Sequence, residues 1–128
     1  DFPLDLAPVL SLALSPAYSE DGTLFAGTES HGLYCSDDRG HNWMRLGEDM
    51  IRSAVNAILL SPEFPENGDV LVVLGEGLLL SRDGGQSWAG WKSGVESNEG
   101  LACVAAPRGL DPDARLLVGL VDGGVLPV

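Results

Sequence analysis

Positive charge is scarce in this sequence of 128 residues. Seven lysines and arginines stand against nineteen aspartates and glutamates, which leaves a formal net charge of −12 at pH 7. The phosphate backbone of a nucleic acid and an anionic membrane surface both repel a chain of this charge. We therefore expect no nucleic acid among its partners.

Long hydrophobic runs are also missing. Apolar runs such as AILL and VLVVL fall far short of the roughly 20 apolar residues that a membrane-spanning helix needs, and no basic segment followed by an apolar one resembles a signal peptide. We expect no direct insertion into a membrane. The sequence opens with DFPLDLAP and no initiator methionine, which favours a processed chain or a piece of a longer one.

Only two cysteines occur, Cys35 and Cys103, and their spacing does not match any set of metal ligands. Each lies in an apolar run, GLYCS and LACVAA, which is typical of a small buried hydrophobic residue. We expect both side chains to be buried, and we expect neither a metal ion nor another cofactor.

Glycine and proline, in contrast, are plentiful. The 17 glycines and 8 prolines make up about a fifth of the chain, against an average of roughly 12%. They fall between short apolar runs, a distribution typical of many tight turns. Because 45% of the residues are apolar, the chain also has enough hydrophobic material for a packed core.

The sequence repeats itself. Residues 9–47 align with residues 55–94 with one residue of slippage, and the anchors are LSP in both copies, EDG against ENG, and the octapeptides SDDRGHNW and SRDGGQSW. A weaker third copy starts at Leu101, with AP in place of SP, an acidic turn and LLVG against LFAG. It stops before its octapeptide would arrive.

Each repeat contains short apolar segments bounded by turn residues, which predicts strands. The expected strands are residues 9–15, 23–28, 32–36 and 42–46 in the first repeat and 55–61, 69–74, 77–81 and 87–91 in the second. A period of 40 to 50 residues that carries four antiparallel strands is typical of a β-propeller blade. We predict an all-β fold and a single partial β-propeller over residues 1–128, with two complete four-stranded antiparallel blades (9–47 and 55–94) and an incomplete third blade (101–128).

The octapeptide can be interpreted residue by residue as a structural turn. Its aspartate can accept hydrogen bonds from backbone amides of the turn, and its serine can close the turn with a hydroxyl. Its glycine supplies a positive φ, and its tryptophan opens the outer strand with a large apolar ring to be buried. The residues are Ser36, Asp38, Gly40 and Trp43 in the first copy and Ser81, Asp83, Gly85 and Trp88 in the second.

These eight positions resemble the Asp-box, or BNR repeat, of a large group of β-propellers. Together with the LSP to LFAGT segment, residues 14–28, the chain is similar to the bacterial sortilin-like, photosystem-assembly-factor-like and xyloglucanase-like repeats of that group. The resemblance implies boxes at the blade periphery, away from any central pocket. The seventh box position is often Ser or Thr in the group and is Asn42 here, so we expect the first turn to be less regular than the second.

Enzymes occur in the Asp-box group, and each kind requires its own set of catalytic residues. A sialidase needs clustered arginines and a tyrosine backed by a carboxylate, but Tyr18 falls in a loop and Tyr34 in an apolar strand. Most acidic residues fall in turns, where solvated carboxylates are ordinary. We assign no catalytic residue. Trp91, three positions after Trp88 and so on the opposite side of a strand, is the candidate binding residue, for a sugar or for a protein.

Two full blades and a partial one leave two blade-sized apolar faces, more than a monomer usually exposes. We therefore expect a protein partner that completes the propeller, either further copies or another chain. The leading hypothesis is a non-enzymatic interaction or assembly scaffold. The alternatives are a carbohydrate-binding or glycoside-hydrolase propeller part, with carbohydrate as partner, and a purely architectural subunit. Since proteins of this group are frequently exported, the resemblance favours an extracytoplasmic location.

Overall fold

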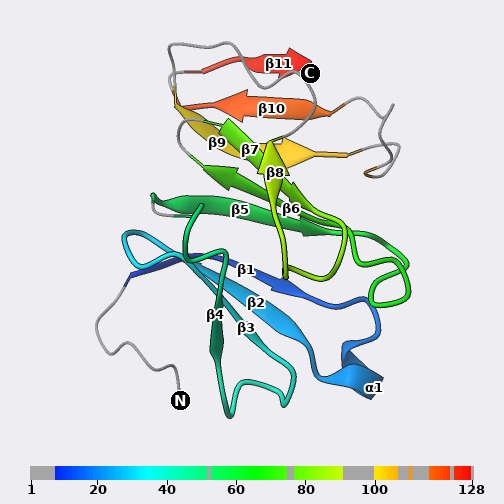
Figure 1. Ribbon diagram of the computed structural model, residues 1–128. Coiled ribbons are helices and arrows are strands. Elements are labelled where there is room, and N and C mark those ends of the chain that lie inside the picture. The colour runs from blue at the N-terminus through cyan, green and yellow to red at the C-terminus, as the bar shows by residue number, and fades with distance from the viewer. Residues whose placement is uncertain are drawn as a thin grey trace.

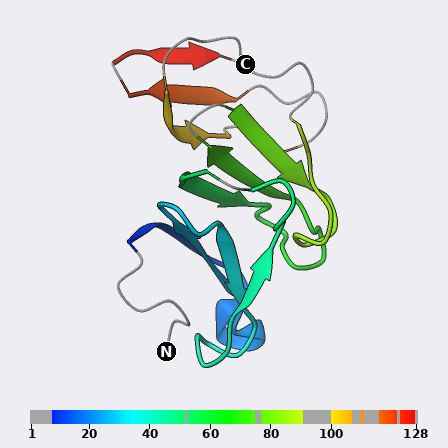
Figure 2. The same cartoon turned by 60° about the vertical axis from the view of Figure 1, so that its left-hand side comes forward.

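The computed structural model describes residues 8–51, 53–74, 77–90, 100–106, 110, 116–121 and 123–127. Within them the chain forms three antiparallel sheets in sequence order, stacked one on the next (Figures 1 and 2). The first sheet contains β1 (Val9–Leu14), β2 (Leu24–Thr28), β3 (Leu33–Ser36) and β4 (Met44–Leu46). The second contains β5 (Val55–Leu60), β6 (Val70–Leu74), β7 (Gly77–Ser81) and β8 (Ala89–Gly90). The third contains β9 (Leu101–Ala105), β10 (Leu117–Leu120) and β11 (Val125–Pro127).

The predicted all-β fold is confirmed, and most strands are one or two residues shorter than predicted. One element was not predicted, the single-turn helix α1 (Tyr18–Asp21), which ends at Gly22 with a φ of 64°. It belongs to the loop after β1, where the Ser15 hydroxyl accepts the Ala17 N–H and donates to Asp21. The serine of LSP thus begins a turn rather than extending a strand.

The register of the inner strands repeats every 46 residues. Ser11 pairs with Gly27 between β1 and β2, Ala57 with Val73 between β5 and β6, and Cys103 with Gly119 between β9 and β10. The backbone repeat is therefore regular even where the sequence resemblance of the third copy is weak.

Two hydrophobic cores lie between the sheets. Strand β6 contributes to both, because alternate side chains point to opposite faces: Val70, Val72 and Leu74 pack toward the first sheet, and Leu71 and Val73 toward the third. All five are buried. This two-sided burial accounts for the continuous apolar run VLVVL, which a strand with one solvated face would not have.

Within the described part of the chain, no further sheet covers the outer faces of the first and third sheets. Leu12 and Leu14 of β1 and Val125 of β11 are exposed. Cys103 is exposed on the same side of the third sheet, and Cys35 is only partly buried, so the prediction that both cysteines are buried is wrong. An apolar run indicates a strand, but it does not indicate which face of the strand a neighbour covers.

No helix among the described residues has the length and hydrophobicity needed to cross a membrane. From its sequence, the N-terminal segment DFPLDLAP is a candidate strand to complete the third blade; its residues 1–7 lie outside the described residues.

Candidate functional site

The first octapeptide forms the turn between β3 and β4, and a ring of hydrogen bonds holds it closed. The Ser36 hydroxyl donates to Asp38 Oδ1 at 2.8 Å and accepts the Gly40 N–H at 2.9 Å. Asp38 Oδ1 also accepts the Asn42 N–H at 2.8 Å, while Oδ2 accepts the Asn42 side-chain amide at 2.7 Å. The Trp43 indole then donates to the Gly40 carbonyl at 3.0 Å.

The second octapeptide, between β7 and β8, repeats this arrangement. The Ser81 hydroxyl donates to Asp83 Oδ1 at 2.7 Å and accepts the Gly85 N–H at 2.8 Å. The Ser87 N–H and hydroxyl donate to the two Asp83 oxygens at 2.9 and 2.6 Å. The Trp88 indole donates to the Gly85 carbonyl at 2.9 Å. In addition, each turn donates one backbone N–H to a carbonyl outside the octapeptide, Arg39 to Gly22 and Gly84 to Gly68.

The expectation that Asn42 loosens the first turn is wrong. Its side-chain amide reaches the same carboxylate oxygen that the Ser87 hydroxyl reaches in the second turn. The backbones also match: Arg39 and Gly40 have φ values of 64° and 91°, and Gly84 and Gly85 have 75° and 101°. An amide or a hydroxyl serves at this position because the position requires only a hydrogen-bond donor.

These hydrogen bonds lower the pKa of both aspartates. Donation by the Asn42 backbone and side chain, and then by Ser36, holds the pKa of Asp38 well below its ordinary range. The Ser87 hydroxyl and N–H, followed by Ser81, lower the pKa of Asp83 to about 2. Both carboxylates are therefore ionised at neutral pH, and neither is suited to donate a proton as a general acid, which needs a pKa near the working pH.

We expect Asp38→Asn to lower the thermal unfolding midpoint by several degrees at pH 7, because one carboxylate oxygen becomes an N–H group facing the Asn42 amide. A carboxylate with a lowered folded-state pKa stabilises the fold above its ordinary pKa of 3.8 and loses this effect as pH falls through the folded value. Below pH 3.8 the difference between variant and parent should therefore shrink. Thermal unfolding of parent and variant at a series of pH values from 7 down to 2 measures this difference in midpoint.

Asp37→Asn is the matched control, since Asp37 is an exposed carboxylate in the same turn. Its melting curve should stay close to that of the parent. Equal losses in both variants would mean that net charge, rather than the turn, sets the effect.

The two tryptophans differ in their surroundings. Trp88 packs against the core between the first and second sheets, where its ring approaches Gly47 of the preceding sheet. Trp43 is half-buried and lines a cleft at the outer rim of the same two sheets. Trp88 thus contributes to the packing between sheets, whereas Trp43 presents part of its ring to a surface hollow.

This outer cleft has a volume of about 360 Å³. Its apolar lining comes from both sheets, with Phe25 and Leu46 from the first, Phe64 from the loop after β5, and Met44 at the margin with 62% of its surface exposed. Polar groups surround the opening; they are Thr23, Asp37, Asn42 and Gln86. The cleft therefore combines aromatic rings with polar groups in its lining.

A second, wider groove of about 470 Å³ lies between the loop after β1 and the loop after β5. Four carboxylates line it, Glu20, Asp21, Glu63 and Glu66. Within the described residues, no three His, Cys, Asp or Glu side chains are grouped closely enough to hold a metal ion.

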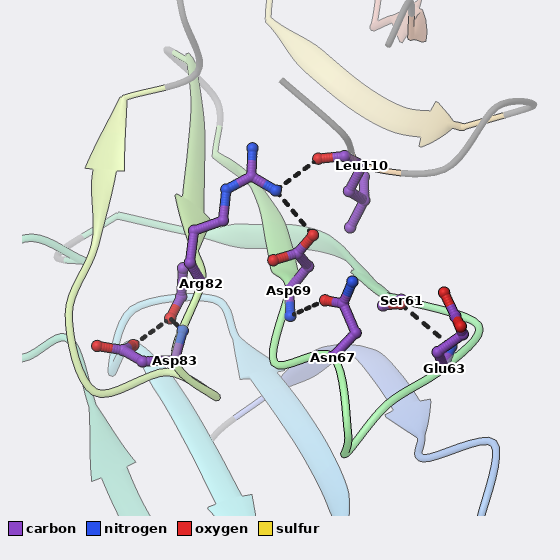
Figure 3. A network of polar contacts seen from close by, with 8 residues as sticks. Ser61, Glu63, Asn67, Asp69, Arg82, Asp83 and Leu110 are labelled. Atoms are coloured by element: carbon purple, nitrogen blue, oxygen red, sulfur yellow. Dashed lines mark hydrogen bonds and ion pairs between the residues drawn. The ribbon is translucent and has the colours of Figure 1, made fainter. Parts of the chain in front are cut away.

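An ionic contact that the sequence did not reveal lies at the ends of β6 and β7 of the second sheet, and its arginine also reaches Leu110, between β9 and β10 of the third sheet (Figure 3). Arg82, the second residue of its octapeptide, donates from Nη1 to Asp69 Oδ2 at 2.7 Å and to the Leu110 carbonyl at 2.8 Å. Residue spacing carries no signal for this contact, because Asp69, Arg82 and Leu110 belong to three separate segments.

Of the residue types that a sialidase would need, Arg39 and Tyr18 lie together. Arg39 lies over the Tyr18 ring, 5.3 Å from its centroid, and donates to the Ser19 carbonyl. Tyr34 is on β3. Burial raises the pKa of the Cys35 thiol to about 11, with Asp37 adding to the shift, so this cysteine is a poor nucleophile. Trp91, the predicted binding residue, lies outside the described residues.

The fold resembles two solved structures. One is an ancestral GH74 enzyme, with a TM-score of 0.68 and 19% identity over 89% of this chain and 14% of that one. The other is the GH74 xyloglucanase from Xanthomonas campestris, with a TM-score of 0.65 and 20% identity over 91% of this chain and 19% of that one. Both are β-propeller proteins. The chain consists of β-propeller blades.

The first and second sheets are four-stranded blades, and the third sheet has three strands among its described residues. The chain spans less than a fifth of the length of either structure that it resembles. No protein-family model matches the sequence, and no curated protein sequence matches it either. At this level of identity the comparison establishes the fold.

Proposed function

We propose that the chain is a non-enzymatic scaffold for protein interaction or assembly, and that the outer cleft between the first two sheets receives an apolar side chain of a partner. The observation that carries this proposal is the cleft itself, with Met44 exposed beside Phe25, Phe64 and Trp43. Aromatic residues and methionine are enriched at protein interfaces, where charged residues are depleted. Methionine in addition adapts its shape to an irregular partner.

The octapeptides support a structural rather than a catalytic role for the chain. In each octapeptide, both carboxylate oxygens of the aspartate accept hydrogen bonds from groups of the same turn. A carboxylate used in this way is not available to activate water or to protonate a leaving group. The similarity of the two turns to the Asp-box adds to this reading, because the resemblance places such boxes away from the functional centre.

Met44→Glu tests the proposal. The immobilised parent chain should capture a stoichiometric protein partner from an extract of the source organism, and the variant should bind that purified partner at least tenfold more weakly, equivalent to about 1.4 kcal/mol. Titration calorimetry with the purified partner measures the change.

Met50→Glu is the matched control, because Met50 is also an exposed methionine but does not line the cleft. It should bind as the parent does. Equal losses of affinity in both variants would show that the cleft is not the binding site. A parent chain that captures no protein would contradict the scaffold function.

A carbohydrate-related role is the second candidate, and the GH74 xyloglucanase among the similar structures favours it. The partly exposed Trp43 ring with nearby Asn42 and Gln86 is compatible with stacking against a sugar. Binding of xyloglucan oligosaccharides, or release of reducing ends from xyloglucan, would support this candidate over the scaffold. A chain that binds neither protein nor glycan would leave the purely architectural role.

A further inference from the structure

The outer cleft and the wider groove beside it meet at one residue. Phe64, in the loop between β5 and β6, lines both hollows. Its ring packs edge-on against Phe25 of β2, with the two centroids 5.8 Å apart and the planes at 77°. Both rings are buried, so this pair joins the first sheet to the second. An apolar hollow and an acidic one therefore form a continuous surface.

The groove lies between two loops of similar construction, which are found at the same end of the first two sheets (Figure 1). Pro16 lines it on one side, and Pro62 and Pro65 line it on the other. In each loop the serine before the first proline accepts a backbone N–H from two residues further on, Ser15 in the first loop and Ser61 in the second. Because a proline ring fixes φ, the groove keeps its walls without a ligand.

The charge of this surface is negative. Four carboxylates line the groove, and Asp37 adds a fifth at the cleft; the four are Glu20, Asp21, Glu63 and Glu66. The described residues that line the two hollows include no lysine, arginine or histidine. Within the described part of the chain, the exposed carboxylates of Glu20, Glu63 and Glu66 have neither a hydrogen bond nor an ion pair. They are available to a partner.

A third hollow borders the other two and contains an arginine. Asp21, Asp37 and Arg39 are among its lining residues. The Arg39 guanidinium lies over the Tyr18 ring and donates to the Ser19 carbonyl, so it is held against α1. One positive charge does not balance the carboxylates that line the three hollows.

These features together select the kind of segment that fits. An apolar side chain suits the cleft, but a segment with acidic residues next to that side chain would be repelled by the carboxylates of the groove. Lysine and arginine combine an apolar stem with a charged end. Their stems can lie along the prolines and Phe64 while their charges reach the glutamates. An apolar centre with a charged margin is also the usual arrangement of a protein interface.

We propose that the partner segment at the outer cleft is cationic, with one apolar side chain in the cleft and lysine or arginine side chains of the same segment in the acidic groove. This inference rests on the proposed function of the cleft and specifies the chemistry of the partner. The charges at the margin accelerate association, whereas the buried apolar contact slows dissociation. Both walls of each hollow belong to this chain, so the site does not depend on what covers the outer faces of the first and third sheets.

Three synthetic pentapeptides test the proposal with the unmodified chain. The first has a central tryptophan between two lysines on either side, the second has glutamates in place of the lysines, and the third has alanine in place of the tryptophan. The first peptide should bind about tenfold more tightly than either of the others, and its affinity should fall about tenfold from low to high salt, because salt screens exposed charges. Fluorescence anisotropy of labelled peptides measures the binding.

The double variant Glu63→Gln, Glu66→Gln removes two charges of the groove. It should bind the lysine peptide about tenfold more weakly, through a slower association, and with a weaker dependence on salt. Glu29→Gln with Glu48→Gln is the matched control, because it changes the net charge equally at two exposed residues that line none of the three hollows. It should bind as the parent does. Circular dichroism should show the same strand content in both double variants.

Equal binding of the lysine and glutamate peptides overturns the proposal. Equal losses in the two double variants also overturn it, because net charge alone would then explain the binding, and so does equal binding of the alanine peptide, because the cleft would then play no part. A captured protein that needs Met44 but binds the Glu63, Glu66 variant as it binds the parent would leave the scaffold function standing and show this inference to be wrong. A chain that binds the lysine peptide as expected but captures no protein would contradict the scaffold function and support the preference for a cationic segment.

Discussion

Replacing Gly27 by alanine is expected to lower the free energy of unfolding by about 1–3 kcal/mol, the range for a methyl group forced into a packed interior. The new Cβ would overlap Ser11 Oγ, the nearest atom, and would lie 2.5 Å from Val55 Cγ1 and 2.7 Å from Val55 Cβ, closer than real atoms approach. Val55 is fully buried, and β2 is paired on both sides, with β1 and with β3. Neither the side chain nor the strand has room to move. Urea denaturation at equilibrium measures the loss.

Gly77→Ala is the control for this prediction, because Gly77 is also a strand glycine but a Cβ there would meet nothing within 4 Å. It should change stability by less than about 0.5 kcal/mol. Val55→Ala should partly rescue Gly27→Ala in a double-mutant cycle, with a coupling of about 0.5–3 kcal/mol. Additive losses would show that the contact with Ser11 or the conformational freedom of glycine, and not the contact with Val55, sets the effect.

The second sheet packs the position equivalent to the Ser11–Gly27 pair in a different way. Gly27 faces the larger Ser11 across the ladder, whereas Val73 at the equivalent position faces the smaller Ala57. The strands themselves were predictable because alternation and turn residues are local signals. Which member of a cross-strand pair carries the larger side chain depends on tertiary packing, so it can be recognised only once the register of the strands is known.

Local signals also explain why the hydrogen bonds inside the octapeptide turns could be predicted, whereas contacts with other segments could not. The hydrogen bonds of Asp83 join residues within four positions of one another, and such contacts follow from residue type and order. Asn42 was misjudged, because a comparison by residue identity overlooked that its amide is a donor like a hydroxyl. The exposed Cys103 was misjudged for a different reason, since its surroundings depend on a neighbouring sheet and not on its own segment.

Arg82 shows most clearly which contacts the sequence cannot predict, because its two partners lie 13 and 28 residues away along the chain. The Asp69 carboxylate that it meets is 8% exposed, whereas the guanidinium is 43% exposed. A carboxylate at this depth needs its partner, since an unpaired buried charge is costly. The arginine also supplies a donor to the carbonyl of Leu110, a residue of the core between the second and third sheets. One side chain therefore connects the rim of one blade to the core of the next.

Arg82→Met is expected to lower the free energy of unfolding by about 1–3 kcal/mol. Removing one partner of a fully buried ion pair costs about 3–5 kcal/mol, and the water that reaches the exposed guanidinium reduces this figure. Adding Asp69→Asn should recover part of the loss, because no unpaired charge then remains. Arg45→Met, at an exposed arginine of β4, should change stability little. If the double variant were less stable than Arg82→Met, Asp69 would serve the fold through contacts other than this ion pair.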